Sequence, residues 1–129
     1  MNSGVANHLK DSLSNFLPYL EEPDFYGTIV STNSGLFYVK GGIFDKAVKL
    51  FSDKDLNFTV NMQPRLIKFE SGAVIGFTSV ENTVGMHLSV AMIIDSPNLT
   101  FRDIQWIRTR LRRPCVDMGR YWFININNI

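Results

Sequence analysis

The stretch Leu66–Pro114 constrains the fold more than any other part of the chain. It contains apolar runs separated by turn residues, followed by a segment with helical periodicity. In the run Val90–Ile94 every residue is apolar, which is typical of a strand buried on both faces of a sheet. The block therefore predicts a sheet with helices packed on its faces.

Strands and turns can be assigned within this block. The predicted order is a strand from Leu66, a Glu70-Ser71-Gly72 turn, the strand Ala73–Ser79, a loop, and the strand His87–Asp95. The helix Thr100–Arg113 follows, where Thr100 and Asp103 have the spacing of a capping box and Pro114 ends the helix.

The rest of the chain supplies weaker signals of the same kind. They predict a helix Val5–Leu20, a hairpin of Phe25–Ser31 with Leu36–Lys40 around Thr32–Gly35, a helix Phe44–Phe51, and a strand Tyr121–Ile126. Ser52–Pro64 fits either a strand or an extended connector. Together these elements predict one α/β domain over residues 1–129, with its core at 5–113 and a C-terminal strand at 120–127. We expect a single, mainly antiparallel sheet of five to six strands, with the first and last helices on the same face.

Composition excludes several classes of protein. The net charge of +1 gives no global attraction to nucleic acid, and 45% hydrophobic residues exclude a disordered chain. No apolar run reaches the ~20 residues of a membrane span, and the polar start does not resemble a signal peptide. Cys115 is the only cysteine, which favours a reducing compartment and a cytoplasmic protein.

No arrangement of residues matches a known catalytic, cofactor or metal site. His8 and His87 are far apart in sequence, and Cys115 lacks an activating context. Gly41-Gly42 lies before a helix, but a phosphate-binding loop needs Ser or Thr where Ala47 stands. The sequence thus predicts no catalytic residue, no cofactor and no metal.

Basic and aromatic residues near the C-terminus are the candidate contact residues. Six arginines lie between Arg102 and Arg120 against two aspartates. The candidate anion or partner site consists of Arg108, Arg112, Arg113 and Arg120. Tyr121, Trp122 and Phe123 are the candidate interface, either as base-stacking residues or buried in the core or a dimer interface.

Four segments together resemble the ATPase half of viral large terminases: Ser71–Phe77, Met92–Ser96, Thr109–Pro114 and Asn125–Asn127. In that family an apolar strand ends in Asp-Glu, which holds magnesium and activates water, whereas here Ser96 follows Asp95. The resemblance implies an ATPase domain that has lost both catalytic motifs. Such a domain would be a remnant or decoy of viral origin that binds nucleic acid or a packaging or defence protein, in an infected host cell.

The order of elements also resembles the roadblock family and, more distantly, profilins and longin domains. This resemblance covers residues 5–113 and implies a homodimer or heterodimer that scaffolds protein partners without catalysis. The favoured hypothesis is therefore a non-enzymatic interaction module with a protein partner, no membrane, and nucleic acid as the less favoured partner. A parallel sheet with a strand on each side of Val90–Ile94 would instead favour the ATPase lineage.

Overall fold

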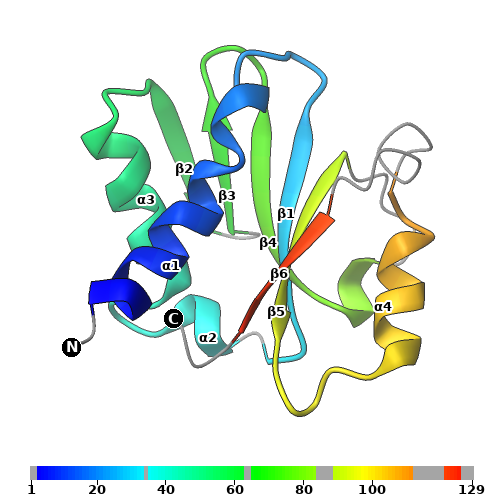
Figure 1. Cartoon of the computed structure of the whole chain (residues 1–129). Coiled ribbons are helices and arrows are strands. Elements are labelled where there is room, and N and C mark those ends of the chain that lie inside the picture. The colour runs from blue at the N-terminus through cyan, green and yellow to red at the C-terminus, as the bar shows by residue number, and fades with distance from the viewer. Residues whose placement is uncertain (1–2, 34, 63–64, 84–88, 112–120, 126–129) are drawn as a thin grey trace.

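The computed structural model describes residues 3–33, 35–62, 65–83, 89–111 and 121–125. Figure 1 shows helices on both sides of one twisted sheet. In chain order the elements are α1 (Ser3–Ser14), η1 (Leu17–Tyr19), β1 (Tyr26–Ser31), α2 (Gly35–Tyr38), α3 (Ile43–Asp53), β2 (Phe58–Met62), β3 (Arg65–Phe69), β4 (Val74–Ser79), η2 (Glu81–Thr83), β5 (Val90–Asp95), α4 (Phe101–Arg108) and β6 (Tyr121–Asn125).

The sheet is mixed, which confirms the α/β class and corrects the expectation of a mainly antiparallel sheet. Within the described residues the strand order is β2-β3-β4-β1-β5-β6. Strand β1 pairs in parallel with β4 and β5, and β5 pairs in parallel with β6. Only β2–β3 and β3–β4 pair antiparallel in this part of the chain. The buried strand Val90–Ile94 thus has a parallel neighbour on each side.

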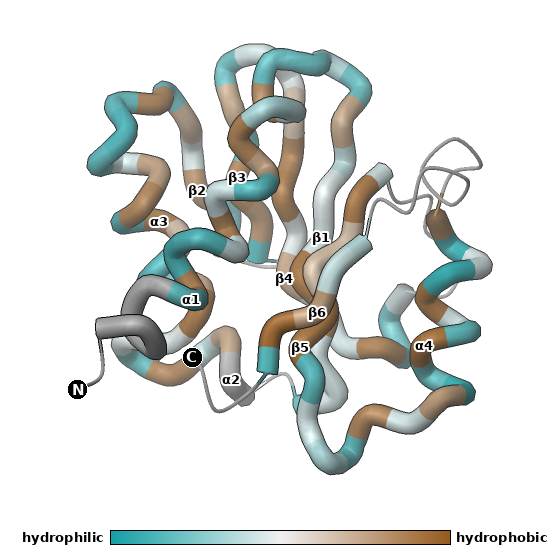
Figure 2. The backbone as a smooth tube through the Cα atoms, viewed as in Figure 1, coloured by the Kyte–Doolittle hydropathy of each residue, from teal (hydrophilic) through white to brown (hydrophobic). Residues whose placement is uncertain are grey.

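The central position of β1 and β5 follows from their side chains. In β5 the five residues from Val90 to Ile94 are buried, and in β1 those from Gly27 to Ser31 are buried. Figure 2 shows hydrophobic residues concentrated along these inner strands. A strand that is apolar on both faces is stable only between two layers, so these strands occupy the middle of the sheet.

The predicted hairpin of Phe25–Ser31 with Leu36–Lys40 is wrong. Only its first arm is a strand, because the second arm begins with the short helix α2. Both edges of β1 are already paired, with β4 and with β5, so no edge remains for a hairpin partner. The helical turn instead places the fully buried Phe37 ring 5.7 Å from the Phe77 ring.

The two faces of the sheet have separate apolar cores. On one face Leu9, Leu13 and Phe16 from the α1 region pack with side chains of α3. On the other face Ile107 and Leu111 pack against β1 and β5. The first and last helices therefore lie on opposite faces (Figure 1), contrary to the expectation of a shared face. The connection from β1 to β4 contains α3 and the connection from β5 to β6 contains α4, and the two run in opposite directions along the sheet. Right-handed crossovers therefore put α3 and α4 on opposite faces, and α1 packs beside α3.

The β3–β4 turn agrees with the sequence prediction. Gly72 has a φ of +104°, and the Gly72 amide donates to the carbonyl of Phe69. A β-carbon at Gly72 would lie 3.0 Å from the carbonyl oxygen of Pro23. Glycine is required at this position by its backbone conformation and by the close approach of a second chain segment.

The capping box at the start of α4 is confirmed. The Thr100 hydroxyl accepts a hydrogen bond from the Asp103 amide at 3.1 Å, and the Asp103 carboxylate accepts one from the Thr100 amide at 3.0 Å. We expect Thr100→Ala to lower the free energy of unfolding by about 1 kcal/mol, measured by urea denaturation. Thr59→Ala, at an exposed position of β2, is the control for loss of a threonine side chain. Equal costs of the two changes would contradict a capping role.

Candidate functional site

The carboxyl ends of the parallel strands meet at one edge of the sheet, at the lower side of Figure 1. Strand β1 leads into Thr32 and Asn33, and β5 leads into Ser96. The hydroxyls of Thr32 and Ser96 lie 3.2 Å apart, so the two loops touch. After β1 the chain moves through α3 toward β4 on one side, whereas after β5 it moves through α4 toward β6 on the other side. The edge between these two strand ends is therefore a topological switch point, the kind of place where α/β sheets bind ligands.

The loop after β1 is ordered by its own side chains. The Ser31 hydroxyl accepts a hydrogen bond from the Asn33 amide at 3.0 Å, and the Asn33 side-chain oxygen accepts one from the Gly35 amide at 3.0 Å. Such local bonds are typical of Ser and Asn in tight turns. The backbone amides of Asn33 and Gly35 are therefore already hydrogen-bonded.

Asp95 is the carboxylate of this edge. It is the exposed last residue of β5, lies opposite Asn125 in the register of β5 with β6, and precedes Ser96. The described residues contain no group of three or more His, Cys, Asp or Glu side chains able to hold a metal ion. A single carboxylate can still hold Mg²⁺ where water and substrate phosphates supply the other ligands.

The same loop does not fit a lysine-type phosphate site. If Gly35 is placed at the second glycine of the phosphate-loop pattern, Leu36 and Phe37 stand where the lysine and the metal-binding hydroxyl are required. Phe37 is fully buried among aromatic rings, so it belongs to the core. The loop Thr32–Leu36 itself contains no lysine or arginine that could neutralise a bound phosphate.

Gly41-Gly42 forms the start of a helix, in agreement with the rejection of a phosphate-binding loop there from the sequence. Gly41 has a φ of +73°, and its amide donates to the Asp45 carboxylate at 2.7 Å, while Gly42 is the N-cap of α3. These glycines form the start of a helix and do not follow a strand. In the sequence, the switch-point loop is indicated by an apolar strand that leads into Ser31-Thr32-Asn33. The same pattern also fits a hairpin turn.

The remaining titratable candidates lie apart from this edge or outside the described residues. His8 is exposed on α1, whereas His87 and Cys115 lie outside the described residues. Burial raises the pKa of the Tyr26 phenol, but Tyr26 is at the opposite, amino end of β1. Its oxygen lies over Gly76, where a β-carbon would be 3.1 Å away.

Of the four candidate arginines, the structure describes only Arg108. Arg112, Arg113 and Arg120 lie outside the described residues. The Arg108 guanidinium lies 5.8 Å from the centre of the Tyr121 ring, and its Nε is shielded without a hydrogen-bond partner in the described part of the chain. The role of the four arginines as an anion or partner site stays a prediction.

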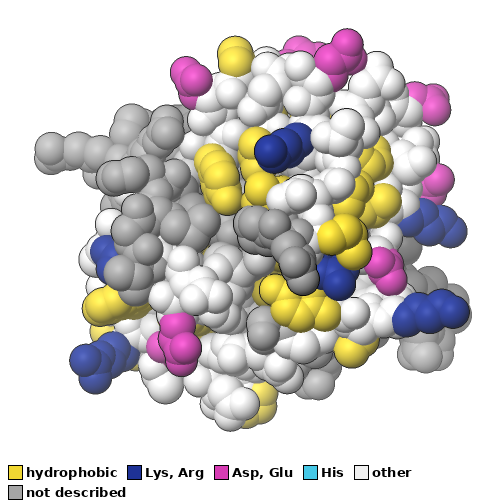
Figure 3. Space-filling model, turned by 180° about the vertical axis from the view of Figure 1, so that it is seen from behind, with side chains coloured by type: hydrophobic (Ala, Val, Ile, Leu, Met, Phe, Trp, Pro, Cys, Tyr) yellow, Lys and Arg dark blue, Asp and Glu magenta, His cyan; other side chains and the backbone are white. Residues whose placement is uncertain are grey.

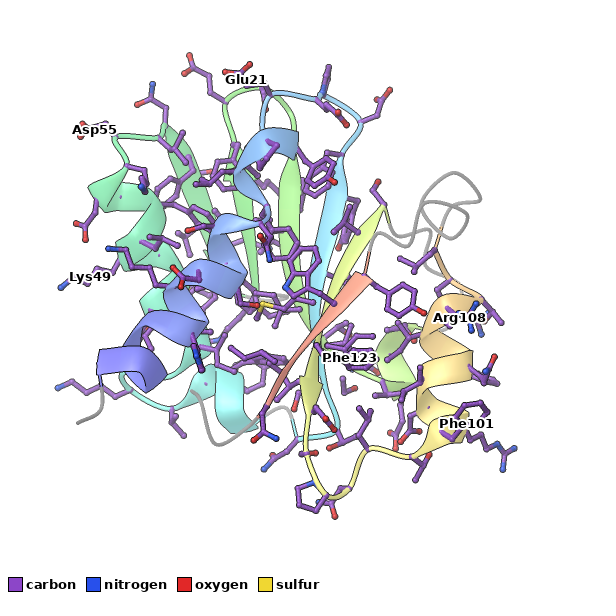
Figure 4. All side chains as sticks on the ribbon, viewed as in Figure 1. Glu21, Lys49, Asp55, Phe101, Arg108 and Phe123 are labelled. Carbon is purple, nitrogen blue, oxygen red and sulfur yellow. The ribbon has the colours of Figure 1, made fainter. Side chains whose placement is uncertain are left out.

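The three aromatic residues of β6 lie on two faces of the sheet. Trp122 packs against the α1 core, donates from its indole nitrogen to the Ser12 hydroxyl at 2.8 Å, and lies 4.9 Å from the Phe16 ring. Tyr121 packs on the α4 core, and Phe123 is 45% exposed (Figure 4). Trp122 thus connects β6 to α1, and the proposed interface role of the triplet stays a prediction.

Comparison with solved structures shows the same fold in viral proteins. The large terminase of a thermophilic bacteriophage matches with a TM-score of 0.60 at 8% identity, over 88% of this chain and 36% of that protein. The Thermus phage P74-26 large terminase ATPase domain matches with a TM-score of 0.58 at 12% identity, over 93% of this chain and 54% of that domain. No protein-family model and no curated protein sequence matches the chain.

These neighbours correct two expectations. The chain has the fold of large-terminase ATPase domains and spans about a third to a half of the length of the structures it matches. The first of these terminases has also been solved in complex with ADP, with a TM-score of 0.58 at 9% identity. An ATPase-type fold contradicts the expectation that the chain is not an enzyme. The roadblock resemblance is not shown, because the parallel strand β1 lies between β4 and β5 and the antiparallel meander therefore extends, in the described part of the chain, only over β2, β3 and β4.

Several expectations about partners and location have no structural test or only a partial one. Among the described residues, no helix is long and apolar enough to cross a membrane. The single-domain assignment over residues 1–129 and the homodimer or heterodimer stay predictions.

Proposed function

We propose that this chain is a terminase-like ATPase domain of viral origin that binds a nucleoside phosphate with Mg²⁺ at the carboxyl edge of β1 and β5. The observation that carries the proposal is the meeting of the two strand ends. The loops after β1 and β5 touch there, with the Thr32 and Ser96 hydroxyls 3.2 Å apart, and Asp95 is the residue before Ser96. Ligands of open α/β sheets bind at this kind of edge.

The residues have distinct roles in this proposal. Asp95 holds the cation, while the Thr32 and Ser96 hydroxyls are donors and acceptors for its water shell or for phosphate oxygens. A bound Mg²⁺ would neutralise phosphate charge and polarise the phosphoryl group. Because Leu36 replaces a phosphate-binding lysine, binding should depend on the cation more strongly than it does in a lysine-containing loop.

We expect a fluorescent ATP analogue to bind the chain in the presence of Mg²⁺ and to be released by EDTA. Asp95→Asn should weaken this binding by about tenfold or more, because the amide lacks the charge that holds the cation. Asp53→Asn, which removes an exposed carboxylate at the end of α3, is the matched control and should leave binding unchanged. Phosphate release is measured in parallel on the same samples.

Two results would contradict the proposal. One is the absence of saturable binding at millimolar Mg²⁺ in a sample whose far-UV circular dichroism shows a folded protein. The other is nucleotide binding that is equally strong with EDTA and in Asp95→Asn, since it would place the nucleotide away from β5.

A further inference from the structure

A pocket of about 230 Å³ lies between α4 and the chain that follows β4. It is lined by Val80, Glu81, Arg102, Asp103 and Trp106. Figure 1 shows the short helix after β4 beside α4. Sites for whole small-molecule ligands usually measure ~300–1,000 Å³, so this pocket has room for only one part of a nucleotide.

Both walls of the pocket begin at the carboxyl edge of the sheet. Strand β4 runs parallel to β1, with Ser79 opposite Ser31, and the Val80 amide donates to the Ser31 carbonyl oxygen at 3.2 Å. The other wall is the first turn of α4, which follows β5 after residues 96–100. The pocket therefore adjoins the strand ends that carry Thr32 and Asp95, on the α4 side of the sheet.

The polar groups of the pocket include an acceptor and a donor without partners. Among the described residues, neither Glu81 nor Arg102 has a hydrogen-bond or ion-pair partner, whereas the Asp103 carboxylate already accepts the Thr100 amide. Figure 3 shows apolar, basic and acidic side chains next to one another along its left edge, on the side of α4. Two carboxylates and one guanidinium disfavour an anion in the pocket itself. They match an uncharged group that offers a donor beside an acceptor.

Trp106 adds an aromatic surface to this lining. It is 40% exposed, and the Arg110 guanidinium lies over its ring, 4.8 Å from the centre. That contact covers one face of the ring and leaves the other face for a planar ligand. Nucleic-acid bases stack on exposed aromatic rings in this way.

We propose that this pocket binds the adenine base of the nucleotide whose phosphates are held with Mg²⁺ at Asp95, an inference that rests on the proposed function. The base stacks on Trp106, its exocyclic amino group donates to Glu81, and Arg102 donates to the ring nitrogen beside that group. A carboxylate cannot donate a hydrogen bond. Hypoxanthine, which carries a carbonyl in place of the amino group, would therefore present an acceptor to an acceptor.

The specificity test uses the full chain and competition against a ribose-labelled fluorescent ATP analogue in the presence of Mg²⁺. We expect ITP, whose base is hypoxanthine, to compete about tenfold more weakly than ATP. Glu81→Gln should reduce this difference to about twofold or less, because an amide both donates and accepts. Glu21→Gln changes an exposed carboxylate at the opposite end of the molecule (Figure 4) and should keep the full difference. GTP is tested alongside.

Adenosine, which has no phosphate, tests the pocket separately from the cation site. The chain has two tryptophans, Trp106 and Trp122, and hence two indole signals in proton–nitrogen correlation spectra. With EDTA present, we expect adenosine at about millimolar concentration to shift the Trp106 signal and not that of Trp122. Trp106→Phe identifies the signal, and Trp106→Ala should weaken binding of the ATP analogue by about tenfold. Asp95→Asn should leave the adenosine shift and the ATP–ITP difference intact.

Three outcomes would overturn the inference. They are equal competition by ATP and ITP, tighter binding of GTP than of ATP, and a Trp106 signal that adenosine leaves unchanged at about 20 mM. If one of them occurs while Mg²⁺-dependent binding of the ATP analogue persists, the phosphate site stands without this base pocket. If adenosine shifts the Trp106 signal but no nucleotide binding depends on Mg²⁺, the pocket is supported and the proposed function is contradicted. Far-UV circular dichroism of each variant shows whether the chain is still folded.

Discussion

Phe16→Ala is expected to lower the free energy of unfolding by about 3–5 kcal/mol, the usual cost of deleting a large buried side chain. Phe16 has no exposed surface, and its ring lies 4.9 Å from Trp122 and 6.3 Å from Phe25. Phe16 therefore connects the α1 region to the edge strand β6 and to Phe25, the residue just before β1. Urea denaturation monitored by circular dichroism measures the loss.

The matched control is Phe101→Ala, which deletes the same side chain at a position that is 75% exposed. It should change stability by no more than about 0.5 kcal/mol. Tryptophan fluorescence adds a local measurement, because Trp122 loses a ring neighbour in Phe16→Ala. A loss below about 1 kcal/mol would show that the surrounding residues collapse into the space and that Phe16 is not a central contact.

Gly27→Ala is expected to destabilise the fold by about 1–3 kcal/mol through overpacking. Alanine in place of a strand glycine normally stabilises the folded protein by ~0.5–1 kcal/mol. A loss of stability in Gly27→Ala would therefore indicate a steric clash. A β-carbon at Gly27 would lie 2.8 Å from ring atoms of Phe25 and 2.9 Å from the Phe16 ring. Both rings are buried and have little freedom to move away.

Gly76→Ala is the control on the neighbouring strand β4. Its β-carbon would meet the Tyr26 oxygen at 3.1 Å and the end of the Leu66 side chain at 3.3 Å, and both of these side chains are only partly buried. We expect a change within about 1 kcal/mol. Combining Gly27→Ala with Phe25→Leu should recover part of the loss; purely additive costs would contradict the steric explanation.

Local patterns identify most of the elements correctly. The apolar stripe of α3, the alternation in β3, the apolar run of β5 and the Thr100–Asp103 capping box all depend on residues within a few positions of one another. Such signals can be found in a sequence because the interactions that produce them are short in range. The Glu70-Ser71-Gly72 turn belongs to the same group, since the positive φ of Gly72 is a local requirement.

The candidate site can be predicted only in part. Asp95 stands out at the end of an apolar strand, but its neighbours Thr32 and Ser96 are 64 residues apart in the chain and meet only through strand pairing. The pocket beside α4 is likewise formed by two distant parts of the chain, Val80 and Glu81 from one and Arg102, Asp103 and Trp106 from the other, so no local pattern shows it. The predicted arginine site at the end of the helix stays a prediction, because three of its four residues lie outside the described residues.

By itself the sequence determined the identity of most helices and strands, the buried character of β5 and the presence of Asp95 at its end. Only the tertiary structure decided the strand order, the opposite faces of α1 and α4, and hence the switch-point edge. The physical reason lies in the Ser31–Gly35 segment, whose turn-forming residues fit a hairpin and a strand-to-helix loop equally well. The choice between them depends on β4 and β5 occupying both edges of β1, which no local pattern encodes.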